Sequence, residues 1–384
     1  MFEPLKRLAA MGTLLVVLCG LARGESPEVL VLMHEPGRVE RYDLASGEHL
    51  GTLLSGLPPA NVLLLDADGR LLISTGLPGG AGTVLRFDPL GAGRIETLID
   101  IPEGYGGRLF RATGMAWHGE DLLVASQGDG KVKRYSYPAG EWQADIALAS
   151  PGGMTQIAMD NGRLYLTDFV AHALRRSSEK LDGAMSEVWA QHAGQSPWGL
   201  VFDDKDRAYW STSGNRVLRS VGQETVEWAG TAGGLNTPVG LGLGPDGLLY
   251  AANLHGQVTI WNTDVPQVGP PVRVIDGPEV KTPLSIAFTT RPLATKEFVY
   301  SAPVESQQAT AEKLAFFESK IRPLLHTRCL DCHGAEAQEG GLRLDSRHGW
   351  EQGGESGTAL APGKPETSLL IKAVQYTDKD KFYF

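Results

Sequence analysis

The stretch "GRLYLTD" (162–168) begins with a turn residue and continues as an apolar run of strand length. The chain repeats this pattern in "GRLLIST" (69–75), "EDLLVAS" (120–126), "DRAYWST" (206–212) and "GLLYAAN" (247–253). Each copy has a second short run after it, such as "ALRRSS" (173–178), and a third before it, such as "WGLVFD" (198–203). Short runs separated by turn residues predict β-strands, at least three to a repeat.

The repeat has a period in the low forties. Its leading runs are anchored at Val62, Gly114, Gln156, Gly199, Gly240 and Ser285. A period of this length with four short strands is typical of a β-propeller blade. Residues 29–54 lack a leading run, whereas 284–289 is a leading run with nothing after it, so the two ends together make a sixth blade. The prediction is a mainly β chain with a six-bladed propeller at 25–290; seven blades is the alternative.

Polar residues recur where the second strand of each repeat is expected to end. Aligning the repeats brings together His34, Thr75, Ser126, Asp168, Thr212 and Asn253. Three of them, His34, Asp168 and Asn253, could meet near the central channel as metal ligands or proton carriers. The alternative is that polar residues at strand ends satisfy backbone groups of the turns.

Arginines also recur, in the third strand of five repeats. They are Arg41, Arg86, Arg134, Arg175 and Arg219. A solvated or blade-linking row is the first interpretation, and an anion site is the alternative.

The repeats resemble the NHL and SMP-30/gluconolactonase-like propellers, whose blades run P-x-G-[apolar]-x-x-D-x-x-G-x-[apolar]-Y. The resemblance covers about residues 27–292 and implies the architecture. Such propellers serve as lactonases, lyases, quinoprotein dehydrogenases or binding scaffolds, so a metal ion or a quinone is a candidate cofactor here. Hydrolases of the SMP-30 group carry a Glu in an "EGP-x-[WY]" motif. The corresponding segment reads "PEVLVLM" (27–33), which does not match and makes a lactonase doubtful.

Composition and the N-terminal segment bear on the partners and the cellular location of the protein. The net charge of -10 argues against a nucleic-acid partner. Lys6 and Arg7 precede an apolar run from Leu8 to Leu21, which predicts a signal peptide at 1–24 and export to the periplasm or beyond the cell. An uncleaved anchor is the alternative, and no other membrane span is expected. After cleavage the chain retains two cysteines, Cys329 and Cys332, too few for a disulfide framework.

The composition changes after an expected linker at 291–311. An amphipathic segment, "AEKLAFFESKIRPLLHTRC" (311–329), predicts a helix that leads into "CLDCH" (329–333). This is the C-x-x-C-H pattern of c-type haem attachment, in which two thiols one helical turn apart meet the two vinyl groups and the histidine binds the iron. A zinc site lacks a second Cys/His pair at the usual spacing, and a redox dithiol lacks a βαβ setting.

The C-terminal segment resembles the planctomycete-type cytochrome c domain over about residues 313–377, on "FFESKIRPLLHTRCLDCHG" and "GGLRLDSRHGWEQGGESGTALAPGKPETSLLIKAVQY". The resemblance implies haem c bound covalently by Cys329 and Cys332, with His333 as proximal ligand. It also implies a later "M-P-P" motif and a closing helix, which the sequence lacks. We therefore expect a C-terminally incomplete module at 312–384, or a sixth ligand such as His326, His348 or water.

Together these patterns predict an exported haem protein that transfers single electrons to a redox partner protein or another haem. The propeller would be its binding or substrate domain, for a small molecule or a polysaccharide. An electron-transfer protein is favoured over a stand-alone enzyme. One alternative makes the propeller a quinoprotein-like dehydrogenase or a hydrolase feeding the haem, which would make the protein an oxidoreductase if catalytic. Another makes it a non-enzymatic scaffold for a polymer or a partner protein.

Overall fold

The computed structural model describes residues 26–76, 80–91, 93–101, 107–147, 153–177, 181, 185–191, 194–221, 224–266, 269–293, 296–301, 315–345, 349, 353–357, 359–360 and 365–375. The expected signal peptide (1–24) lies outside them. Among the described residues, no helix combines the length and the apolarity that a bilayer span requires.

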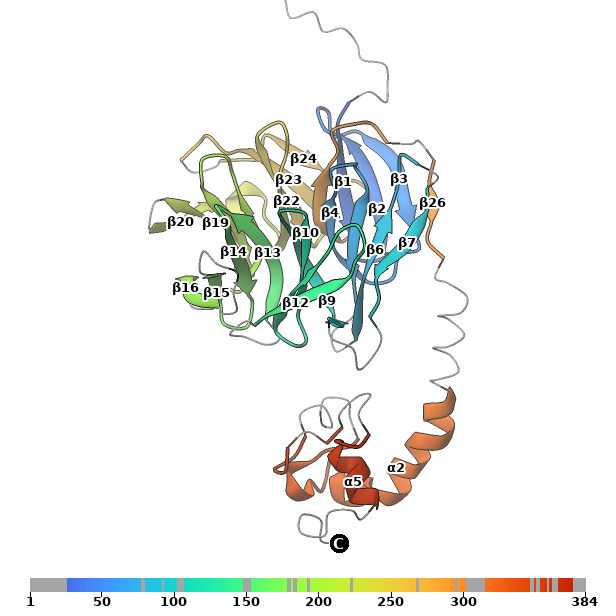
Figure 1. Cartoon of the computed structure of the whole chain (residues 1–384). Coiled ribbons are helices and arrows are strands. Elements are labelled where there is room, and N and C mark those ends of the chain that lie inside the picture. Colours follow the sequence, from blue (N-terminus) through green and yellow to red (C-terminus); the bar gives the residue numbers. More distant parts are fainter. Residues whose placement is uncertain are drawn as a thin grey trace, which may run out of the picture.

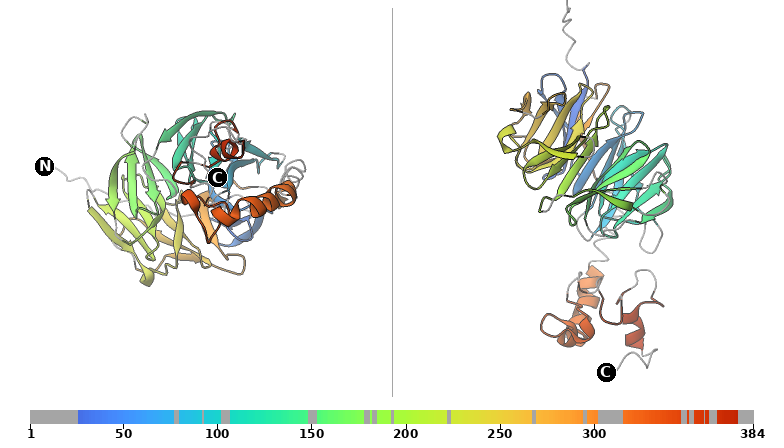
Figure 2. Two further views of the ribbon diagram at one scale, coloured as in Figure 1. Left: turned by 90° about the horizontal axis from the view of Figure 1, so that it is seen from below. Right: turned by 90° about the vertical axis from the view of Figure 1, so that its left-hand side faces the viewer.

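Six antiparallel sheets stand in a ring around a central axis (Figure 1; Figure 2, left). Blade 1 consists of β25 (Pro283–Phe288), β1 (Glu28–Met33), β2 (Arg38–Asp43) and β3 (His49–Ser55), with β26 (Phe298–Val299) added at its outer edge. Blade 2 consists of β4 (Ala60–Leu65), β5 (Leu71–Thr75), β6 (Ala81–Phe87) and β7 (Ile95–Ile99), with β8 (Leu109–Phe110) beside β6. Blade 3 consists of β9 (Ala112–His118), β10 (Asp121–Ser126), β11 (Lys131–Tyr135) and β12 (Trp142–Ala147).

The other three blades repeat this order. Blade 4 consists of β13 (Met154–Asp160), β14 (Arg163–Asp168), β15 (Ala173–Ser177) and β16 (Met185–Gln191). Blade 5 consists of β17 (Pro197–Phe202), β18 (Ala208–Thr212), β19 (Arg216–Val221) and β20 (Glu224–Ala229), and is followed by the 3-10 turn η1 (Thr231–Gly233). Blade 6 consists of β21 (Pro238–Leu243), β22 (Leu248–Asn253), β23 (Gln257–Asn262) and β24 (Arg273–Ile275). The predicted six-bladed propeller is confirmed.

The ring is closed by strands from its two sequence ends. β1 pairs with β25 so that Val31 lies opposite Ile286, and β25 supplies the leading strand that residues 29–54 lack. The closure removes the open edges that would otherwise flank the ring. Blade 1 also takes β26, in parallel with β3, from the segment expected to be a linker. Phe298 packs on Phe87 with ring centroids 5.1 Å apart, which anchors that segment to blade 2.

The leading strands approach one another closely around the axis. A side chain at Gly199 would place its Cβ 2.4 Å from the Val239 carbonyl oxygen, and one at Gly240 would place it 2.3 Å from that of Leu284. Hydroxyl groups connect the same strands: Ser211 accepts from the Gly199 amide and donates to the Val239 carbonyl. The second strands behind them are buried on both faces, as in β5, where all five residues are buried. This rigid inner wall fixes the side chains at the channel.

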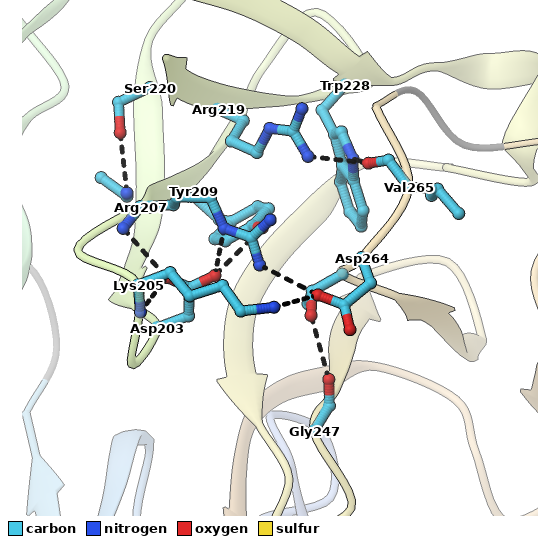
Figure 3. A network of polar contacts seen from close by, with 12 residues as sticks. Asp203, Lys205, Arg207, Tyr209, Arg219, Ser220, Trp228, Gly247, Asp264 and Val265 are labelled. Atoms are coloured by element: carbon cyan, nitrogen blue, oxygen red, sulfur yellow. Dashed lines mark hydrogen bonds and ion pairs between the residues drawn. The ribbon is translucent and has the colours of Figure 1, made fainter. Parts of the chain in front are cut away.

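Adjacent blades are also joined near their outer strands. Arg219 of β19 donates to the carbonyl of Val265 (Figure 3). Trp228 of β20 donates to the same carbonyl, and Arg219 donates also to the carbonyl of Pro266. At the surface, Lys205 pairs with Asp264. These contacts fasten the loop after β23 onto blade 5.

The C-terminal described residues are helical, as the sequence predicts (orange to red in Figure 1). The elements are a π-helical turn η2 (Phe317–Ile321), α2 (Arg322–Arg328), α3 (Leu330–His333), a 3-10 turn η3 (Glu339–Gly341) and α5 (Leu369–Gln375). Pro323 lies in the first turn of α2, directly after the π-helical residues, and has no N–H to donate back to them. The π-helical geometry before it ends at the same place, so the proline divides two helical segments rather than breaking one.

Candidate functional site

The Cys329–His333 motif occupies a single helical turn at the junction of α2 and α3. Cys329 closes α2 by donating its N–H to the carbonyl of Leu325 at 2.9 Å. The carbonyl of Cys329 then accepts the N–H groups of Cys332 at 3.3 Å and His333 at 2.8 Å. Both cysteines are free thiols; Cys329 is half-buried and Cys332 is exposed. Burial raises the pKa of the Cys329 thiol. Two thiols are therefore held one turn apart, with the histidine directly after them.

His333 is held by its backbone, and one of its ring nitrogens has no partner among the described residues. Its carbonyl accepts the N–H of Leu344 at 2.8 Å, and the residue bridges to Gln338. Its Nδ1 is buried and has no hydrogen-bond partner in the part of the chain that the structure describes. A buried polar atom without a partner is uncommon, and this nitrogen is open to a water molecule or a bound group.

The residues present fit the covalent attachment of a c-type haem. Within the described residues, no three His, Cys, Asp or Glu side chains gather as a metal site would require. Large apolar side chains of the helical part are also exposed, Phe316 by 59% and Leu324 by 56%, as suits a module that packs against an apolar macrocycle. His348, a suggested sixth ligand, lies outside the described residues.

In the propeller, Asp168 and Asn253 lie at strand ends with their side chains engaged locally. Asp168 is fully buried, pairs with Arg175 at 2.8 Å and accepts the N–H of Ala171. Asn253 donates to Thr259 and accepts the N–H of Asn236. These contacts satisfy turn and strand groups, and neither residue lines the central cavity.

His34 lies one position later than the repeat alignment places it. Met33, opposite Pro283, is the counterpart of Asn253, opposite Pro238. The N–H of His34 donates to the carbonyl of Thr282, and Gln127, Phe169 and Leu254 make the same bond in their blades. This later position faces the channel, so the structure brings His34 together with Gln127 and Phe169 rather than with Asp168 and Asn253.

The repeated arginines are engaged within or between blades. Arg41 is buried against Glu28, Arg134 pairs with Asp121, and Arg86 pairs with Glu96 and reaches Pro138 in the next blade. Arg175 does not occupy the position of the other repeated arginines. The strand register places Arg176 there, opposite Tyr165.

A cavity of about 470 Å³ lies where the six leading strands meet, a volume typical of small-molecule sites. Its polar lining includes Arg111, which the sequence analysis does not single out. Arg111 precedes β9 with a φ of 53°, a conformation that non-glycine residues rarely adopt. The sequence hints at this position only through the spacing of its repeat anchors, since Val62 and Gly114 lie farther apart than any other neighbouring pair and Arg111 falls in the extra length between them.

Comparisons with known proteins match two different parts of the chain. Residues 329–382 match the family model for planctomycete cytochrome C. Solved structures resemble the propeller: one in a nidogen/laminin complex has a TM-score of 0.55 at 17% identity and covers 68% of this chain and 98% of that one. A protein of unknown function from Bacteroides caccae has a TM-score of 0.53 at 14% identity, with the same coverage. At these identities the likeness concerns the fold alone. No curated protein matches the sequence.

Proposed function

We propose that this chain is an exported c-type haem protein that carries single electrons, with the propeller as its binding or substrate domain. The observation that carries the proposal is the Cys329–His333 turn, with its two free thiols, within a segment that matches the cytochrome family model. The proposed division is a signal peptide at 1–24, the propeller at 25–290, a linker at 291–311 and the haem module at 312–384.

In this proposal, Cys329 and Cys332 each form a thioether to the haem, and His333 is the proximal iron ligand. The backbone bonds from Cys332 and His333 to the Cys329 carbonyl hold the three side chains in the order that attachment needs. When bound, the haem would supply one-electron redox chemistry, with a potential set by the axial ligands and the surroundings. The exposed Cys332 leaves an edge of the module open to solvent, where a redox partner protein or a second haem could approach.

The propeller's proposed role rests on the central cavity. A cavity of this size with an aromatic wall and a few polar groups is what a small-molecule site requires. If the propeller is instead a dehydrogenase that feeds the haem, addition of its substrate should reduce the haem; a scaffold would bind its ligand without reducing it.

Cysteine replacement tests the attachment. We expect Cys329→Ser and Cys332→Ser each to retain haem through one thioether with a shifted haemochrome band, and the double variant to lose covalent haem on a denaturing gel. Thr327→Ser, at an exposed position of α2, is the matched control and should stain like the natural chain. Covalent haem in the double variant would overturn the assignment.

A further inference from the structure

We propose that the central cavity of the propeller binds a small organic acid, whose carboxylate pairs with Arg111 and whose hydroxyl group donates to Gln156. This deepens the proposed binding role of the propeller and does not depend on the haem. The proposal rests on the charge of the cavity, on polar atoms left without partners, and on the apolar walls around them.

The charge of the cavity is positive. Of the residues that line it, Arg111 and His34 are the ones with basic side chains, and none is an Asp or a Glu. Burial lowers the pKa of Arg111, yet a guanidinium stays protonated at neutral pH. Among the described residues no carboxylate pairs with Arg111, although the protein carries a net charge of -10. A partly buried cation without a counter-ion is costly, and an anion would remove that cost.

The guanidinium is held in place by neutral groups. Arg111 Nη1 donates to Gln127 Oε1 at 2.6 Å, and Gln127 Nε2 donates to the carbonyl of Met154 at 2.9 Å. The backbone N–H of Gln127 also donates to the carbonyl of Arg111. Gly76 leaves room for this arrangement, since a Cβ there would lie 3.1 Å from the Arg111 Cα. An orienting amide fixes the guanidinium but does not neutralise it.

Three lining residues hold buried polar atoms without a hydrogen-bond partner in the described chain. They are Nε of Arg111, Oε1 of Gln156 and Nδ1 of His34. Most other polar side chains of the cavity are engaged; Thr155, for example, bonds to Thr167 and to the carbonyl of Trp198. A donor and an acceptor left open in one cavity call for a ligand with both an anionic oxygen and a hydroxyl group.

The remaining wall is apolar and aromatic. Trp198 and Phe169 meet edge to face with ring centroids 4.9 Å apart, and Leu254 and Ile286 line the cavity with them. Such a wall favours an apolar or ring-shaped body over a bare inorganic anion. The chemistry therefore points to a cyclic or aromatic hydroxy acid.

The test is calorimetric titration of the full-length holoprotein with 4-hydroxybenzoate, benzoate, acetate and the neutral 4-hydroxybenzamide. We expect 4-hydroxybenzoate to bind best and the amide to bind at least about 10-fold more weakly, because the amide oxygen accepts a hydrogen bond from Arg111 but does not neutralise its charge. Arg111→Asn should weaken the binding of 4-hydroxybenzoate by a similar factor. Asparagine is chosen because it tolerates the positive φ. Arg94→Asn, at a side chain 80% exposed, is the matched control and should bind normally.

Each outcome decides the proposal. Absence of binding by all three acids at millimolar concentration, equal affinity for acid and amide, or unchanged binding by Arg111→Asn would overturn it. Because Arg111→Asn also removes the hydrogen bond to Gln127, Gln156→Leu provides a second variant. It should weaken 4-hydroxybenzoate but not benzoate, and equal loss for both would contradict the assigned role of Gln156. A haemochrome spectrum of the same sample reports the proposed haem function separately.

Discussion

Glu28 and Arg41 show how a charge is accommodated in the core of the propeller. Their side chains are 1% and 4% exposed and form two bonds of 2.7 Å, between Nε and Oε2 and between Nη2 and Oε1. Glu28 also accepts the N–H of Leu293, so the pair ties β1 and β2 to the chain that follows β25. A buried pair of this kind is costly to break, because either partner alone is a buried charge.

We therefore expect Arg41→Met to lower the free energy of unfolding by about 3–5 kcal/mol, and Glu28→Leu/Arg41→Met to recover part of that loss. The exposed Arg94→Met should change it by no more than about 0.5 kcal/mol. Urea unfolding monitored by tryptophan fluorescence measures all three. Similar values for Arg41→Met and Arg94→Met would contradict the buried-pair account.

The hydrogen bonds of Asp66 make the free energy of unfolding depend on pH. Burial alone would raise the pKa of its carboxyl, but hydrogen bonds from Tyr137 and from the Arg70 backbone and side chain outweigh burial and hold the pKa below its ordinary value. With a folded pKa below the unfolded one, the stabilisation is present above the unfolded pKa of about 4 and is lost as pH falls through the folded pKa.

Asp66→Asn should therefore be less stable than the natural chain at neutral pH, and its stability should fall less steeply from about pH 5 to about pH 2. Asp68→Asn, at a side chain 69% exposed, is the matched control. The midpoints of urea unfolding, measured for both variants and the natural chain across this pH range, test this prediction. A slope unchanged in Asp66→Asn would show that this carboxyl does not titrate as described.

At the level of single residues, the sequence indicates the Cys329–His333 motif more directly than the residues of the channel. Cys329, Cys332 and His333 are contiguous, so one helical turn determines their spacing. His34 is displaced by one position in the repeat alignment because its leading strand, β25, lies about 250 residues away and gives no local register. Arg111 falls outside the repeat, so no period indicates it. Long-range pairing, rather than local pattern, decides both positions.

The leading strands are the elements on which the cavity depends. Their glycines are there because neighbouring backbones leave no room for a Cβ, as at Gly240. We expect Gly240→Ala to destabilise the protein by about 1–3 kcal/mol, since a backbone carbonyl must shift. Gly269→Ala, which meets nothing within 4 Å, should stay within about 0.5 kcal/mol. Thermal unfolding compares the two, and equal midpoints would argue against close packing at the axis.

At the level of elements, the repeat predicts the blades well and the connections less well. The predicted strands are present because each has a turn before it and an apolar, strand-length run, as in β5 and β14. β26 and β8 were not predicted, since two-residue strands carry no period. β26 pairs with the outer strand β3, and β8 pairs with Ala81 and Gly82 at the start of β6, so both form through pairing with an existing strand rather than through their own pattern.

At the scale of the whole molecule, two signals of different kind identify two parts. The period of the repeat identifies the propeller, and the spacing of two cysteines and a histidine lies in the segment that matches the cytochrome family model. The parts also differ in polar chemistry. The propeller holds a cationic cavity within a chain of net charge -10, and the C-terminal segment holds free thiols beside a histidine ring nitrogen that has no partner among the described residues.

The measurement that tests the central claim most directly is a pyridine haemochrome spectrum combined with the intact mass of the protein, exported from a host with c-type maturation machinery. The account predicts a haemochrome band typical of two thioethers, haem that stays with the chain after denaturation, and a mature mass increased by a single haem. A mature chain of unmodified mass, in which Cys329 and Cys332 both react with a thiol reagent, would contradict it.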